Sequence, residues 1–174
     1  MILIRSILLI FFIFSGLLYS QATVTFTLPV VTLMDVEPAG NMTLNFTAPT
    51  EAGNPLVNPT PNTSKWINYT SAITTGGLSR RITAALINQP IPGVNIRLQA
   101  ATASGTGGGA LGTPSAQVTL TTTPITIISG IGGAYTGNGV NNGHRLTISL
   151  VPGTYANLSP QANTVITIVY TITE

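Results

Sequence analysis

The chain has 174 residues, with six Lys and Arg, four Asp and Glu, one His and no Cys. Only 6% of the residues are charged and 44% are hydrophobic, which excludes a disordered, strongly charged chain. A nucleic-acid-binding surface needs several Lys or Arg on one face, so the low charge argues against nucleic acid as a partner. Without Cys the chain has no disulfides, no thiolate metal site and no lipoprotein anchor.

The first residues are typical of a secretory signal peptide. A short basic region ends at Arg5, an apolar run follows over residues 7–14, and small residues stand at Ser20 and Ala22. No basic stop-transfer cluster follows, which favours a cleaved signal over residues 1–20 rather than a retained anchor. We expect an exported protein of the periplasm, cell surface or extracellular space, without a membrane span in its mature chain, which begins at Gln21 or Thr23. An exported chain without Cys favours a bacterial source.

Residues 21–174 are expected to form a single all-β domain. Apolar residues alternate with Thr, and no window of a dozen residues has the apolar spacing of a helix. Nine short strands separated by Pro-, Gly- and Asn-rich turns predict an antiparallel β-sandwich. The expected strands are 23–33, 42–48, 65–73, 80–87, 94–101, 117–122, 125–128, 145–151 and 164–173.

Two of these strands carry further expectations. In the last one, Ile168 and Tyr170 share one apolar face with Ile166 and Ile172, which predicts a central, well-covered strand. In the first one, four apolar residues alternate with Thr and with Pro29; they are Val24, Phe26, Leu28 and Val30. Such a segment either pairs within its own sheet, which we favour, or mediates self-association by adding a strand to a neighbour or to another surface protein. Pro29 confines it to an edge or a bulge.

Aromatic residues raise the question of a glycan ligand. Trp66 and Tyr69 lie in one expected strand, where alternation directs them to opposite faces. A Trp on an inner strand of a sandwich is more often part of the core than a stacking platform for a sugar. A carbohydrate-binding module requires Trp66 and some of Tyr69, Tyr135 and Tyr155 to form one exposed surface.

No motif predicts a catalytic, cofactor or metal site. Residues 107–112, GGGALG, match a dinucleotide fingerprint in spacing, but a Thr-rich strand follows instead of a helix, and a flexible loop is expected. Asp35 and Glu37 would lie on one side of an extended segment at a spacing compatible with a glycosidase pair, without the aromatic residues of a sugar site. His144 stands in a Gly- and Asn-rich run with no second ligand, which indicates a surface or turn histidine. An enzyme is therefore the least favoured class.

The end of the chain resembles bacterial secreted pilin-like domains of the spore-coat-protein-U kind. The resemblance covers about the last thirty residues and rests on Gly153-Thr-Tyr155 and on the run from Pro160 through Asn163 to Tyr170. It implies an immunoglobulin-like sandwich exported for assembly at the cell surface. We therefore expect a non-catalytic structural or adhesive subunit, such as a pilus-like, fimbrial or surface-layer component, with a carbohydrate-binding module as the alternative.

Overall fold

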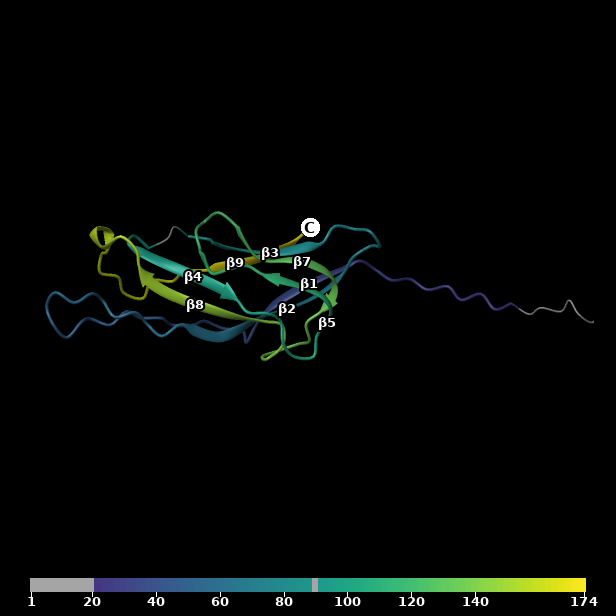
Figure 1. The fold of residues 1–174 in the computed structure, drawn as a ribbon, viewed down its shortest axis with the longest axis horizontal. Helices are drawn as coiled ribbons and strands as arrows, with labels where there is room; N and C mark the ends of the chain where they lie inside the picture. Colours follow the sequence, from purple (N-terminus) through teal and green to yellow (C-terminus); the bar gives the residue numbers. More distant parts are fainter. Residues whose placement is uncertain (1–20, 89–90) are drawn as a thin grey trace, which may run out of the picture.

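The structure, a computed structural model, describes residues 21–88 and 91–174, and their regular structure is almost wholly β (Figure 1). The expected signal peptide lies outside these residues. The described strands are β1 Val31–Glu37, β2 Asn62–Ala72, β3 Arg80–Leu86, β4 Val94–Ala100, β5 Gly108–Pro114, β6 Val118–Thr119, β7 Ile125–Tyr135, β8 His144–Pro152 and β9 Ile168–Thr173. A single 3-10 turn, η1 Tyr155–Asn157, precedes β9. The expectation of an all-β fold is confirmed for the residues that the structure describes. No helix in the described ranges is long and apolar enough to cross a membrane.

All strand pairs are antiparallel, and their order is β6-β4-β8-β2-β7-β3-β9. Two further strands lie off this path, because β1 pairs with β2 and β5 pairs with β7. Strand β2 has β1 along one side and changes partner along the other. Its first half pairs with β8 as far as Ile67, and Thr70 and Ser71 pair with β7. β2 therefore connects two halves of the sheet: β8, β4 and β6 on one side, and β7, β3 and β9 on the other.

Both halves of the sheet bury side chains in one hydrophobic core. Alternate residues of β4, β8 and β2 meet alternate residues of β3 and β7, as the period of two requires. The members that are essentially inaccessible to solvent include Ile67, Ile82, Leu98, Ile128, Ile131 and Leu146. One contiguous core therefore joins the described strands.

The first strand begins later than its sequence pattern indicates. Residues 21–30 belong to no strand, and β1 starts at Val31. The reason lies in the partner strand: Val31 is opposite Ala72, the last residue of β2, and the chain then turns, with the Gly77 amide donating to the Thr74 carbonyl. Residues before Val31 thus have no partner in their own sheet. The expected strand 42–48 is also absent, apart from a bridge between Thr47 and Val57.

The glycine-rich segment that was expected to be a flexible loop is strand β5. It pairs with β7 through an irregular register between Gly109 and Leu111. Gly109 has φ +87°, and a Cβ atom there would lie 2.2 Å from the Gly133 carbonyl oxygen. The glycines therefore let the backbones of β5 and β7 approach closely. This packing explains the glycine-rich run 107–112 without a role in phosphate binding.

The last strand is at an edge and not at the centre of the sheet. β9 pairs with β3 alone among the described strands. Its inward face, which includes Ile168, Tyr170 and Ile172, is half-buried, whereas the corresponding residues of β3 and β7 are buried. The alternation within β9 was predicted correctly, but its central position was wrong.

Candidate assembly surface

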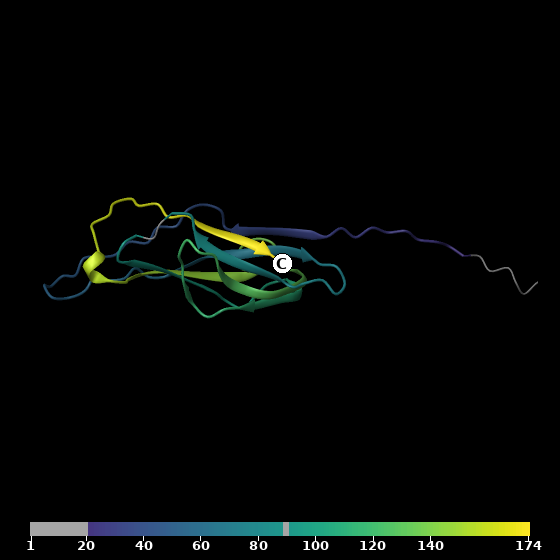
Figure 2. The ribbon, with the colours of Figure 1, turned by 90° about the horizontal axis from the view of Figure 1, so that it is seen from above.

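The segment 21–30 extends away from the domain and is exposed along its whole length (Figures 1 and 2). Its four apolar side chains are among the most exposed in the protein: Val24 83%, Phe26 84%, Leu28 79% and Val30 60%. These are the residues that alternation singled out. Exposed apolar side chains in a row are costly to hydrate, and a contiguous set usually marks a surface that another molecule covers.

Four strands have a free edge in the described part of the chain, and three of them carry features that oppose pairing. β6 is only two residues long, and β5 carries a register irregularity and the positive-φ glycines Gly109 and Gly112. Short length and bulges are common means of preventing edge-to-edge association. β1 carries two acidic residues, Asp35 and Glu37. β9 has no charge, no Pro and no register irregularity in its pairing with β3, so its free edge is unprotected.

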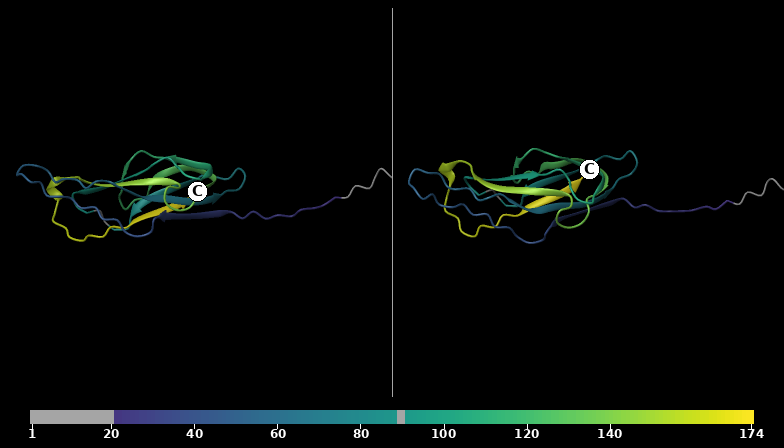
Figure 3. Two further views of the ribbon diagram at one scale, coloured as in Figure 1. Left: turned by 90° about the horizontal axis from the view of Figure 1, so that it is seen from below. Right: turned by 60° about the horizontal axis from the view of Figure 1, so that its bottom comes forward.

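The free edges of β1 and β9 lie side by side. Figures 1 and 2, which view the molecule at right angles, both place the two strands next to each other, and Figure 3 shows them together from below. We call these two edges, with the half-buried apolar side chains that they direct onto the common core, the β1–β9 seam. These side chains are Met34, Val36, Ile166, Ile168, Tyr170 and Ile172, where Ile166 immediately precedes β9. Among the described residues, six of the eleven partly buried hydrophobic side chains that pack against the core belong to the seam.

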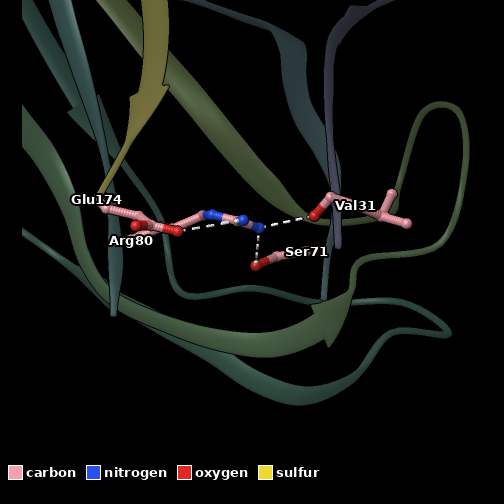
Figure 4. Close-up of polar contacts among 4 residues, drawn as sticks. All are labelled: Val31, Ser71, Arg80 and Glu174. Carbon is pink, nitrogen blue, oxygen red and sulfur yellow. Dashed lines mark hydrogen bonds and ion pairs between the residues drawn. The ribbon is translucent and has the colours of Figure 1, made fainter. Parts of the chain in front are cut away.

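Arg80 spans one end of the seam (Figure 4). Its Nη1 donates to the Val31 carbonyl oxygen at 2.7 Å and to Ser71 Oγ at 3.0 Å, and its Nη2 lies 3.4 Å from Glu174 Oε1. Arg80 is 3% exposed, so its charge-assisted hydrogen bonds to the carbonyl and hydroxyl compensate for burial, while the bond to the exposed carboxylate is worth little. Because Val31 begins β1 and Glu174 follows β9, the two strands run in opposite directions along the seam.

The two aromatic residues that could have formed a sugar platform do not share a surface. Tyr69 is 4% exposed and belongs to the hydrophobic core, on the same face of β2 as Ile67. Trp66 is half-buried on the other face, where its direct cross-strand neighbours are Glu37 and Arg145. Trp66 is not part of the core cluster, so the expectation of a buried Trp is wrong, because the inward positions of β2 are those of Ile67 and Tyr69.

His144 is buried and is not a surface or turn histidine. It is the first residue of β8 and is fully inaccessible to solvent. Its Nδ1 donates to the Ala101 carbonyl oxygen at 2.8 Å, and its Nε2 lies 3.1 Å from the Tyr69 hydroxyl oxygen. The Tyr69 ring is stacked on the imidazole. The hydroxyl also reaches the Leu111 carbonyl. These contacts connect β2, β5, β8 and the end of β4, so His144 has a structural role. The turn before it was predicted correctly, with positive φ at Asn141 and at Gly143.

Burial of Tyr69 predicts a loss of stability at alkaline pH. Desolvation raises the pKa of Tyr69 above its ordinary value of 10.0, and burial also raises that of Tyr170. In the unfolded chain both phenols ionise near pH 10, whereas in the folded protein they stay protonated. The free energy of unfolding should therefore be unaffected below pH 10 and fall above it, by up to about 1.4 kcal/mol per pH unit for each phenol. Urea unfolding at pH 9, 10 and 11 measures this slope. The Tyr69→Phe, Tyr170→Phe double variant should have a flatter slope, and an unchanged slope would show that other groups cause it.

Asp35 and Glu37, the acidic pair singled out in the sequence, both belong to β1. Asp35 and Glu37 lie on one face of β1, opposite Asn68 and Trp66, and Asp35 Oδ1 accepts a hydrogen bond from the Val36 amide at 2.7 Å. In residues 21–88 and 91–174, no group of three His, Cys, Asp or Glu side chains could hold a metal ion. The surface of interest is therefore the exposed segment 21–30 together with the seam. The sequence indicated the segment through its alternation, but it gave no signal for the seam.

Comparison of the chain with protein-family models, with curated proteins and with solved structures gave no match.

Proposed function

We propose that this protein is an exported, non-catalytic structural subunit of a bacterial cell surface that assembles with copies of itself by strand addition. The observation that carries the proposal is the segment 21–30, an extended chain with four exposed apolar side chains that lies outside its own sheet. The sparse charge and the signal-like N-terminus support export to the surface. A pilus-like or other fimbrial assembly is the type of structure that such subunits build.

The domain that presents the segment is, in this proposal, an immunoglobulin-like sandwich. The pairings divide into β1-β2-β8-β4-β6 and β5-β7-β3-β9, with β2 and β7 joined at one corner. Both groups contribute to one core, as two sheets packed face to face would. The supports are the antiparallel pairing, the number of strands and the shared core.

Strand addition is favoured over non-specific hydrophobic contact because the segment is already suited to a sheet. It alternates apolar residues with Thr, a residue that β-strands favour, and it has no charged residue that would oppose pairing. An added strand obtains affinity from main-chain hydrogen bonds and specificity from alternate side chains. Pro29 removes one donor and restricts the strand on only one of its edges.

Sedimentation of the protein beginning at Gln21 tests the proposal. We expect multimers whose proportion rises with concentration, and we expect Phe26→Asp to sediment as a monomer, because the charge would enter an apolar contact. Thr27→Asp is the matched control: it adds the same charge on the other face of the segment and should retain much of the assembly. A parent protein that stays monomeric at high concentration, or a Phe26→Asp variant that assembles like the parent, would rule out this mode of assembly.

A further inference from the structure

We propose that Asn138 is a site of spontaneous deamidation, at which the Gly139 backbone nitrogen attacks the Asn138 side chain and converts it to aspartate or isoaspartate. The chain contains two Asn-Gly pairs, and both lie in the loop between β7 and β8. The second pair, Asn142-Gly143, is held in an arrangement that blocks the same reaction. This inference goes beyond the proposed function and does not depend on it.

The reaction is an intramolecular acyl transfer whose only co-reactant is water. The backbone nitrogen of the residue after Asn loses its proton and forms a bond to the Asn Cγ atom. The Cγ–Nδ2 bond breaks, which releases ammonia and leaves a five-membered succinimide ring. Water then opens the ring. Attack at Cγ gives aspartate, and attack at the main-chain carbonyl carbon gives isoaspartate, in which the main chain runs through Cγ. Glycine favours the attack because it has no side chain to obstruct its nitrogen.

Two conditions decide whether a folded protein permits this reaction. The attacking N–H group must be free to lose its proton to water and to move toward Cγ. The Asn side chain must also be free to rotate until Cγ meets that nitrogen, because the rate depends on how often the reacting atoms come together. Hydrogen bonds to either group oppose both movements.

Asn138 and Gly139 meet both conditions. Asn138 is exposed, and within residues 21–88 and 91–174 its side chain forms no hydrogen bond. The Gly139 amide donates to no group in the same part of the chain. Gly139 has φ +82°, and a Cβ atom there would meet nothing within 4 Å, so the space beside it is open.

Asn142 and Gly143 meet neither condition. The Gly143 amide donates to the Ser104 carbonyl oxygen at 2.9 Å, and Gly143 is buried. The Asn142 side chain is fixed by both of its polar atoms. Its Oδ1 accepts from the Thr106 amide at 3.0 Å and from the Thr106 hydroxyl at 3.1 Å. Its Nδ2 donates to the Asn138 carbonyl oxygen at 2.8 Å. Rotation of the Asn142 side chain toward the Gly143 nitrogen would break these bonds.

The difference in hydrogen bonding predicts a difference in rate. Asn142 can react only when the loop opens and both its side chain and the Gly143 amide are released. A tenfold lower rate corresponds to an opening cost of about 1.4 kcal/mol, which is the size of one or two net hydrogen bonds. We therefore expect Asn138 to react at least about tenfold faster than Asn142.

The product matters in this protein because charged side chains are so sparse. Residues 21–174 contain five Lys and Arg, since one of the chain's six is Arg5, and they contain four Asp and Glu. One new carboxylate makes the acidic and basic side chains equal in number. Without net charge, copies of the protein repel each other less and associate more readily. Because the reaction needs no enzyme, this acidic form accumulates with the age of the protein.

Peptide mapping by mass spectrometry tests the inference on the protein beginning at Gln21. The folded protein is incubated in mildly alkaline buffer, and fragment ions separate conversion of Asn138 from that of Asn142. We expect Asn138 to convert at least about tenfold faster, and an acidic band to appear on isoelectric focusing at the same rate. In urea the two rates should become similar, because both sites are Asn-Gly. Asn138→Gln is the control variant: it keeps a side-chain amide but cannot form the five-membered ring, so the acidic band should disappear.

The other outcomes each contradict the inference. Equal rates at the two sites of the folded protein, or a faster reaction at Asn142, would show that the hydrogen bonds of the loop do not protect Asn142. A much faster reaction at Asn138 in urea as well would assign the difference to local sequence instead of the fold. Conversion of Asn138 in urea only would show that the folded loop restrains this site too. An acidic band that persists in Asn138→Gln would place the modification at another residue.

Discussion

A domain that begins at Val30 should remain folded, stay monomeric and become more stable when a peptide of residues 21–30 is added. The truncation removes only exposed residues, and starting at Val30 keeps the new α-amino group off Val31, beside Arg80. A peptide that binds only the folded domain should raise its free energy of unfolding by about 2.7 kcal/mol at one hundred times its Kd. Thermal or urea unfolding with increasing peptide concentration measures this gain.

The control peptide carries Phe26→Asp and should give little stabilisation at the same concentration. A domain that unfolds after the truncation would show that the segment belongs to its own fold. A folded domain that neither peptide stabilises would show that the segment has no acceptor on this protein.

The second large effect is expected in the core, where Ile128→Ala should destabilise the monomeric domain far more than Ile168→Ala. Ile128 of β7 is completely buried, and truncation of such a side chain to Ala costs about 2–5 kcal/mol, which includes the cavity that is left. Ile168 of β9 is half-buried at an edge strand, so less contact is lost. Chemical denaturation of the domain that begins at Val30 provides both values.

The same pair of variants separates stability from assembly. In the protein beginning at Gln21, Ile168→Ala should weaken multimers beyond its effect on the isolated domain, because β9 has an unprotected free edge to which a strand can be added. Equal losses of stability for Ile128→Ala and Ile168→Ala would mean that β9 is as well covered as β7 in the monomer. The free edge of β9 would then have no half-buried side chains for an added strand to cover.

The sequence was sufficient to predict the strands that pair with a neighbouring strand on both sides. β3, β4 and β8 lie within one or two residues of their predicted bounds, because burial on one face imposes a period of two. The first and last strands show the limit of this reasoning. Alternation reports that a segment can bury one face, but it does not report what covers that face. Residues 23–30 and β9 both alternate, but the apolar side chains of residues 23–30 are exposed and those of β9 are only half-buried within the domain.

His144 and β5 were both predicted wrongly from the sequence, for different physical reasons. His144 follows a turn, and its burial depends on Tyr69, Leu111 and Ala101, which lie on distant segments of the chain. No local pattern could indicate these partners. β5 was missed because glycine lowers strand propensity, and its value in this place comes from close contact with β7. The seam and the Arg80 bridge likewise depend on which strands become neighbours, which the strand pattern alone does not determine.

The close backbone contacts at Gly109 and Gly143 have a consequence for the divergence of this sequence. A Cβ atom at either position would lie 2.2 Å from a backbone carbonyl oxygen, and both residues have positive φ. By contrast, the alternating strand positions can exchange Ile, Val, Leu and Thr at modest cost, so they drift readily during evolution. In distant relatives that keep this fold, these two glycines should therefore persist after most of the strand sequence has changed. Their spacing of 34 residues, from position 109 to position 143, would then be a more durable signature of common descent than overall identity.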